Sequence, residues 1–301
     1  MGYLLLAFAL TFGIIKAYCG KKTASAAALA RDAIMINAVR MSICAFLGIA
    51  IVLFSGASDT LISEKIILIS LLSGVANAAF TVSWLLSVHS MAFMMVEVFV
   101  MGGSIIPLLL CAVIYKEKIS AFQIFGVLLL LIAVYCMCTR DRTGKIRMAP
   151  RDLIPLLLTA VSSGLCDFSQ KLFVKEAGGV NTATFNFYTY LFATVILLLA
   201  LCFLRLKSAK ASKTKKENKV VIPILHYVVI MAVCLFLNVY FKTLAAGHLD
   251  AVLLYPLNQG CAVLLSLLMS MIIFKEKMNT KGFIGIGLSV IAMIIINVFA
   301  K

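Results

Sequence analysis

The sequence predicts an all-α, polytopic membrane protein with ten transmembrane helices arranged as two inverted five-helix repeats. Three observations predict this fold class: an apolar composition, ten long apolar runs and an internal repeat. Of the 301 residues, 63% are hydrophobic and only 13% are charged, and the mean hydropathy is +1.10. A typical globular chain is about a quarter charged. The charges here are too few to cover a water-exposed surface, so we expect the excess apolar surface to face lipid.

Ten apolar runs are each long enough to cross a hydrocarbon core, which takes about twenty residues. Lipid offers the backbone no hydrogen-bond partners, so each run is expected to be helical. The runs are too long and too uniformly apolar for the alternating strands of a closed barrel. They cover approximately residues 2–20, 33–54, 66–88, 91–115, 119–139, 153–175, 182–204, 220–242, 249–274 and 280–299.

Glycine and proline interrupt the fourth and ninth runs, at Gly102, Gly103, Pro107 and Pro256. Such residues are tolerated in membrane helices where neighbouring groups satisfy the backbone, and small residues let helices approach closely. These positions are interpreted either as kinks and packing sites or as flexible gates.

An internal repeat with an offset of 159 residues aligns residues 84–138 with residues 243–297. The aligned pairs include Lys116-Glu117-Lys118 with Lys275-Glu276-Lys277, and His89 with His248. Apolar segments share leucine and alanine by chance, but they do not readily share a charged triplet and a histidine in one register. Each repeat holds five spans, an odd number, so the second repeat must be inverted relative to the first. Inverted repeats are typical of secondary transporters.

The repeat divides the chain into a first half at residues 1–139, a linker at 140–152 and a second half at 153–301. The loops after the odd-numbered runs carry 18 of the Lys and Arg residues, and the opposite side carries about six, Lys242 among them. By the positive-inside rule the odd-numbered loops, including the linker, are cytoplasmic. We therefore expect a multi-pass integral protein of the plasma (inner) membrane with both termini outside.

The net charge of +15 follows from these loops and does not indicate nucleic-acid binding. No aromatic residues interleave the basic segments as stacking platforms would require. The nine cysteines lie almost entirely inside apolar runs, with no Cys-x-x-Cys and no histidine at metal-ligand spacing. A disulfide framework, a metal site or another cofactor is therefore not expected. Nucleotide-binding and hydrolase motifs are absent as well, so the chain is not expected to be an enzyme.

Ten helices, two inverted repeats and a Lys-Glu-Lys triplet after the fourth helix of each half resemble the drug/metabolite transporter superfamily. More narrowly, the chain resembles the EamA-like transporter family. In that family a very short acidic-basic turn links the last two helices of each repeat, and Glu117 and Glu276 fit this place. The first helix of a repeat often carries Gly with Lys seven positions later, as at Gly164 and Lys171. The first half departs from this pattern by one residue, with Gly13, Gly20 and then Lys21.

The resemblance covers essentially the whole chain and implies a solute-carrier fold with a central cavity and a small-molecule substrate. It does not imply which substrate. An arginine in the second helix is common in the family, and Arg40 fits it, whereas the second half has Tyr188 in that region. The small multidrug relatives use an acidic residue in the first helix. This chain has Lys16 there instead, so proton-coupled export of lipophilic cations through that helix is not expected.

Ionisable residues at membrane depth are functional candidates, because their insertion costs a few kcal/mol. Lys16 and Arg40 lie in adjacent runs and would repel each other unless an anion, such as a substrate carboxylate or phosphate, lies between them. The alternative is pairing with Glu97 or Asp167 inside the bundle. These two acids are candidates for proton coupling, because burial favours the neutral carboxyl. Lys171 lies nearer a helix end, from which it could reach the interface.

Uncharged polar side chains complete the candidate substrate site: Asn77, Trp84, Tyr188, Tyr255, Asn258 and Gln259. Most amides in membrane helices simply bond neighbouring helices. Tyr255, Asn258 and Gln259 surround Pro256, where an interrupted helix would expose backbone to a cavity. Trp84, the only tryptophan, is expected to line the pocket or to lie in the interfacial belt.

The residues favour a secondary transporter of a small polar or amphipathic metabolite, with export as one option. Two alternatives remain. A membrane enzyme acting on a lipid-linked substrate would need paired acids or histidines near one interface. A receptor or scaffold without transport activity would have fully satisfied polar faces and no polar cavity. The sequence leaves the oligomeric state open. Convergence of Lys16, Arg40, Glu97 and residues 255–259 on one cavity would favour transport.

Overall fold

The computed structural model is helical throughout the part of the chain that it describes, with no strand in that part. The described residues are 1–27, 29–54, 63–91, 93–116, 120–138, 150–176, 179–210, 222–275 and 280–298. The helices are α1 (Gly2–Ala24), α2 (Ala30–Phe54), α3 (Glu64–Ser90), α4 (Phe93–Gly102), α5 (Ile105–Tyr115), α6 (Ala121–Cys138), α7 (Pro150–Glu176), α8 (Thr182–Lys210), η1 (Ile222–Ile224), α9 (Leu225–Ala246), α10 (Ala251–Ile272) and α11 (Thr280–Val298).

Each of the ten apolar runs contains a helix, and the fourth run is divided into α4 and α5. Eight helical segments in the described residues are long and apolar enough to cross a membrane: α1, α2, α3, the α4–α5 pair, α7, α8, α9 and α10. The remaining helices, α6 and α11, occupy the fifth and tenth runs but do not belong to these eight. The total of ten spans therefore stays a prediction.

The outside of the bundle is apolar, and polar and charged side chains are buried inside it among apolar ones. Large side chains such as Phe46, Leu53 and Phe203 are about 70% exposed on α2 and α8. Buried positions instead include Asn37, Arg40, Asn77, Glu97 and Asp167. In water the exposed apolar surface would favour aggregation. In lipid it has a matching solvent, and polar side chains are retained where they face other helices.

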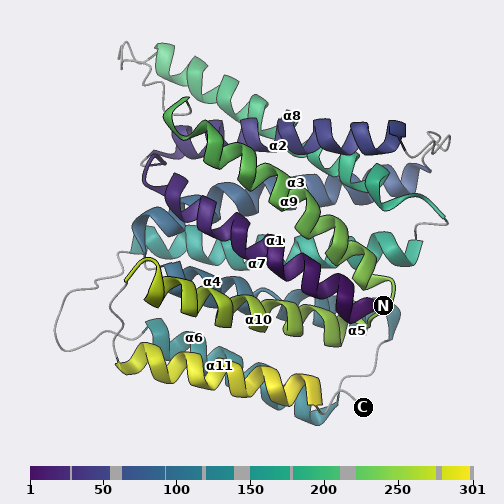
Figure 1. Cartoon of the computed structure of the whole chain (residues 1–301), viewed down its shortest axis with the longest axis vertical. Helices are drawn as coiled ribbons and strands as arrows, with labels where there is room; N and C mark the ends of the chain where they lie inside the picture. The colour runs from purple at the N-terminus through teal and green to yellow at the C-terminus, as the bar shows by residue number, and fades with distance from the viewer. Residues whose placement is uncertain are drawn as a thin grey trace.

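The helix contacts are symmetric under exchange of the two predicted halves. Helix α1 packs on α9, and the equivalent pair across the halves, α7 and α3, also packs together. Three further sets of pairs join equivalent helices: α2 with α8, α4 and α5 with α10, and α6 with α11. The α3–α8 pair also has an exchange-related counterpart, α9 with α2. Figure 1 shows α2 and α8 at one edge of the molecule, α6 and α11 at the other, and α1, α3, α7 and α9 between them.

The first helices of the two halves run in opposite directions. A Cβ on Gly2, at the start of α1, would lie 2.9 Å from Cγ of Leu249. Lys171, near the end of α7, donates a hydrogen bond of 2.8 Å to the carbonyl of the same Leu249. The start of α1 and the end of α7 therefore lie at the same end of the bundle. Inverted repeats require this arrangement, and the inversion itself stays a prediction.

The local backbone repeats as well as the sequence. Two non-glycine residues in the described part of the chain have positive φ, Lys116 at 54° and Lys275 at 50°. They lie 159 residues apart, the offset of the sequence repeat, and each follows the helix that ends the fourth span of its half. Glu117 and Glu276, which the family resemblance singled out, lie outside the described residues, as does the predicted linker up to residue 149.

Glycine at the α4–α5 junction permits a backbone-to-backbone contact with α7. A Cβ on Gly103 would lie 2.2 Å from the carbonyl oxygen of Ala160, and one on Gly164 would lie 2.3 Å from the carbonyl oxygen of Gly103. Neither oxygen can move without displacing a helix. The glycines of the fourth run thus serve close packing between the predicted halves, whereas α10 continues as a helix through Pro256.

We predict that Gly164→Ala destabilises the protein by about 1–3 kcal/mol, the usual cost of overpacking. The matched control is Gly287→Ala on α11, where an added Cβ meets nothing within 4 Å. Thermal unfolding of both variants in one detergent measures the difference. A Gly164→Ala midpoint equal to that of Gly287→Ala would contradict the close contact.

Candidate functional site

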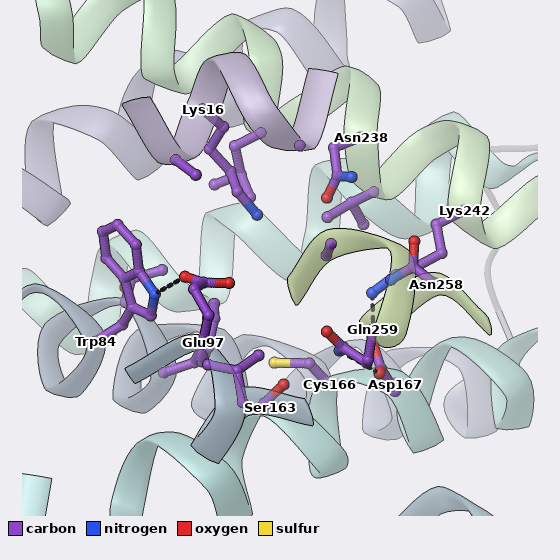
Figure 2. Close-up of a pocket in the computed structure, with 18 of the residues that line it drawn as sticks. Lys16, Trp84, Glu97, Ser163, Cys166, Asp167, Asn238, Lys242, Asn258 and Gln259 are labelled. Carbon is purple, nitrogen blue, oxygen red and sulfur yellow. Dashed lines mark hydrogen bonds and ion pairs between the residues drawn. The ribbon is translucent and has the colours of Figure 1, made fainter. Parts of the chain in front are cut away.

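A polar cavity of about 100 Å³ lies between the two predicted halves. Its walls come from α1, α2, α3 and α4 of the first half and from α7, α9 and α10 of the second. Figure 2 shows these helices surrounding a space into which charged and amide side chains point. Five acidic and basic side chains line it: Lys16, Arg40, Glu97, Asp167 and Lys242.

At one side of the cavity Asp167 forms a buried ion pair with Lys242, with 2.5 Å between Oδ1 and Nζ. Its other oxygen, Oδ2, accepts a hydrogen bond of 3.2 Å from the Gln259 amide. These three residues come from α7, α9 and α10, and all are at least nine-tenths buried. Both carboxylate oxygens are thus occupied, which a buried ion pair needs if attraction is to offset the loss of hydration.

At the other side Glu97 accepts a hydrogen bond of 2.9 Å from the indole Nε1 of Trp84. The indole is held in place by packing. It meets Phe93 edge to face with 6.2 Å between ring centroids. A Cβ on Gly20 would lie 2.6 Å from its Cη2 and Cζ3 atoms, so only glycine leaves room for the ring on α1. Trp84 thereby fixes the position of the Glu97 carboxylate in the cavity wall.

Lys16 extends from α1 into the space between Glu97 and the Asp167–Lys242 pair, as Figure 2 shows. It is partly exposed, because its side chain faces the cavity. Among the described residues one ion pair is formed at the cavity, between Lys242 and Asp167, and Lys16 takes part in none. The Lys16 ammonium is therefore a cation available to a solute in the cavity.

Arg40 on α2 is the second cation of the cavity wall without a carboxylate partner in the described part of the chain. Only 2% of it is exposed. Its Nη1 donates to the Met231 thioether over 3.5 Å, and its Nε has no partner among the described residues. A thioether is a weak acceptor. The guanidinium thus keeps unused donors beside the cavity.

The amides of the cavity divide into those used for packing and those with a free acceptor. Asn238 donates to the carbonyl of Ala9 over 2.6 Å, and Asn77 donates to the carbonyl of Ser73 over 2.9 Å. The oxygen of Asn258, at least nine-tenths buried, has no hydrogen-bond partner among the described residues. Gln170 also lines the cavity, and its Oε1 likewise has no partner among the described residues. Asn258 and Gln170 are therefore the cavity amides that can accept from a donor on a solute.

The structure brings eight of the ten sequence-predicted site residues to this cavity: Lys16, Arg40, Asn77, Trp84, Glu97, Asp167, Asn258 and Gln259. The other two lie elsewhere. Tyr188 on α8 packs against Phe187 and Phe192, because α8 lies outside the ring of helices that forms the cavity. Tyr255 is fully buried in a separate apolar cluster with Leu5 and Phe168, one helical turn nearer the start of α10.

Lys242 is the site residue that the sequence missed. The run was predicted to end at residue 242, which put this lysine at the membrane surface. Helix α9 instead continues to Ala246, so Lys242 lies within it and only 7% of it is exposed. The uncharged residues 243–246 that follow indicate, from sequence alone, that the helix could continue past Lys242. Neither predicted pairing of Lys16 or Arg40 with an acid forms at salt-bridge distance, because Lys242 occupies Asp167.

Lys171 does not reach the interface as expected. It is 3% exposed, and its Nζ donates to the carbonyls of Ala246 over 3.1 Å and Leu249 over 2.8 Å. The positive charge satisfies carbonyls at the C-terminal end of α9, where it also interacts favourably with the helix dipole. His89, whose Nδ1 lies 2.8 Å from the carbonyl oxygen of Ala24, meets the C-terminal end of α1 in a similar way.

A match to the model of the EamA-like transporter family covers residues 153–298. No curated protein sequence is significantly similar to this chain. Twenty-seven chains of solved structures match it. One of them, described only as the crystal structure of a protein, has a TM-score of 0.66 and 15% sequence identity, with 97% of both chains covered. At that identity the likeness shows the fold alone, and it extends over nearly the whole chain.

The family match lies in the second predicted half, which contributes Asp167, Lys242, Asn258 and Gln259 to the cavity. Together with the eight apolar helices, this match identifies the protein as an integral membrane protein whose residues 153–298 match the EamA-like transporter family, part of the drug/metabolite transporter superfamily.

Proposed function

We propose that the protein is a secondary transporter that moves a small polar or amphipathic metabolite across the plasma (inner) membrane. Alternating access between two inverted five-helix halves, residues 1–139 and 153–301, carries the solute through the cavity. The observation that supports this most is the Lys16 ammonium, which faces the cavity with no carboxylate within salt-bridge distance in the described part of the chain. A scaffold would gain nothing from a cation left in this position, because charges at membrane depth cost a few kcal/mol.

The cavity lies where a carrier of this kind needs its binding site. Discontinuous helices and repeat interfaces near mid-membrane form the sites of inverted-repeat transporters. Here the wall includes helices of both halves, and the exchange symmetry of the helix contacts supports a two-fold relation between them. The volume of about 100 Å³ is below the roughly 300 Å³ of common ligand pockets. This small volume favours a small solute and, in the proposed cycle, a closed state.

Side chains close the cavity at both ends. Near the end of α1, Tyr18 and Phe93 both pack against Phe274, with 5.9 Å and 6.2 Å between ring centroids. Near the start of α1, Leu5 and Leu6 pack with Tyr255 and Phe168. In alternating access each closure opens in turn, so these two clusters are the proposed gates.

Proton coupling is assigned to Glu97. Its partner is an indole N–H, which a neutral carboxyl group can also accept. Asp167, by contrast, is held by Lys242 and Gln259, and its protonation would leave the Lys242 ammonium without a counter-charge. Asp167 is therefore assigned the structural role of joining α7 to α9.

Lys16→Gln is expected to lower solute affinity about tenfold to a hundredfold, because a hydrogen bond to a charged group contributes about 1.5–3 kcal/mol. Lys65→Gln is the control, since it makes the same charge change at an exposed position in the first turn of α3. Solutes found by a thermal-shift screen of the purified protein are assayed for uptake and efflux in proteoliposomes. Equal transport by the two variants would remove Lys16 from the site.

Glu97→Gln is expected to abolish the dependence of transport on a proton gradient while leaving exchange of solute across the membrane. The glutamine keeps an acceptor for Trp84 but cannot release a proton. Counterflow and gradient-driven uptake, measured in the same vesicles, separate the two activities. Gradient-driven uptake equal to wild type would contradict the assignment to Glu97.

Asp167→Asn and Lys242→Gln are each expected to destabilise the protein by about 3–5 kcal/mol, because each leaves one buried charge unpaired. The double variant should recover most of that loss, since both charges are then removed. Thermal unfolding of the three variants in detergent gives the coupling between the sites. Additive losses in the double variant would show that the pair does not hold α7 to α9.

A further inference from the structure

We propose that the cavity binds an anion with a single negative charge, a short-chain monocarboxylate whose carboxylate contacts Lys16. This proposal rests on the proposed function, because it assumes that a solute enters the cavity. It goes further by assigning the chemical class of that solute from the charges and unused hydrogen-bonding groups of the wall.

When all five ionisable groups are charged, with Glu97 in its deprotonated form, the charges that line the cavity sum to one positive charge. Lys16, Arg40 and Lys242 are cations, and Glu97 and Asp167 are anions. In a low-dielectric interior, uncompensated charge is costly, and a solute that restores neutrality is favoured. A monoanion gives neutrality. A dianion would leave a net negative charge, and a cation would raise the net charge to two.

The unused groups of the wall are mainly donors. Asp167 is occupied on both oxygens, and Glu97 is engaged by Trp84. Lys16 has no hydrogen bond to a described residue, and Arg40 has only the thioether of Met231 and a free Nε. A carboxylate supplies two acceptor oxygens, and hydrogen bonds between it and these cations are charge-assisted.

The shape of the wall around Lys16 selects a small solute. Gly13 and Ala17 are the small lining residues of α1 near Lys16. A Cβ on Gly13 would lie 3.1 Å from Nδ2 of Asn238, so α1 and α9 leave little space there. The remaining wall includes Leu10, Ile14, Val100 and Ala262, which form apolar surface for a short hydrocarbon chain. The free acceptor of Asn258 adds a position for a hydroxyl group on that chain.

The protein contains its own probe for this test. Trp84 is the chain's only tryptophan, and it lines the cavity. Its fluorescence therefore reports the cavity alone. Purified protein in detergent is titrated at constant ionic strength with propionate, with its neutral amide propionamide, and with succinate, inorganic phosphate and ethylammonium.

We expect propionate to change the Trp84 emission saturably, and the other four compounds to act at least tenfold more weakly. Lys16→Gln should weaken the propionate response at least tenfold, Lys16→Arg should retain it, and the exposed control Lys65→Gln should match wild type. A thermal unfolding midpoint equal to that of wild type establishes that each variant is folded. A Lys16→Gln variant that is folded and binds propionate as wild type does would overturn the proposal.

Three further outcomes would also overturn it: no response to propionate in wild type, an equal response to propionamide or ethylammonium, or a response to phosphate without one to propionate. Proteoliposome assays separate this inference from the proposed function. If both wild type and Lys16→Gln transport a neutral or cationic solute, the proposed anion site is wrong and the proposed transport function stands. If propionate binds through Lys16 but no solute is transported in either direction, the proposed transport function is wrong and the proposed anion site stands.

Discussion

A charge at membrane depth has little water to solvate it, and the interior of this protein is organised by where its charges find partners. Asp167 is satisfied by Lys242 and Gln259, from three helices of the second half. Glu97 is held by the indole of Trp84. Lys171 is satisfied by carbonyl groups at the end of α9. Once these groups are paired, Lys16 and Arg40 remain as cations without a carboxylate partner in the described part of the chain. These two cations determine the chemical character of the cavity.

The same constraint explains why polar residues gather in helices of both halves. Exchange of the predicted halves maps the α1–α9 contact onto α7–α3 and the α3–α8 contact onto α9–α2, and it leaves the α2–α8 and α6–α11 pairs unchanged. The cavity lies among those crossing helices, but its charges are not symmetric. Lys16 and Glu97 come from the first half, and Asp167 and Lys242 from the second. The predicted repeat would thus supply a common framework, while the individual side chains make the two sides of the site different.

The sequence predicted the helical, membrane-spanning class because hydrocarbon thickness and backbone hydrogen bonding leave few alternatives. It also singled out Lys16, Arg40, Glu97 and Asp167, since a charge in an apolar run is conspicuous. It could not predict which charges pair. Lys242 was predicted to lie at the membrane surface because the apolar run was predicted to end there. Helix α9 continues for one more turn, so Lys242 lies within the bundle. Tyr188 and Tyr255 were indistinguishable in sequence from the amides that line the cavity, because a phenol packs equally well in an apolar cluster.

Gly103 and Gly164 bring the α4–α5 junction against α7, backbone to backbone, with no side chain between them. Such a contact has no rotamers to rearrange and little free volume to compress. It lies between elements of the two predicted halves, and in the proposed transport cycle it would act as a fulcrum. Relative tilting of the halves about a fixed point of this kind would widen one end of the bundle as it narrowed the other, so a passage open at both ends would be disfavoured by geometry alone.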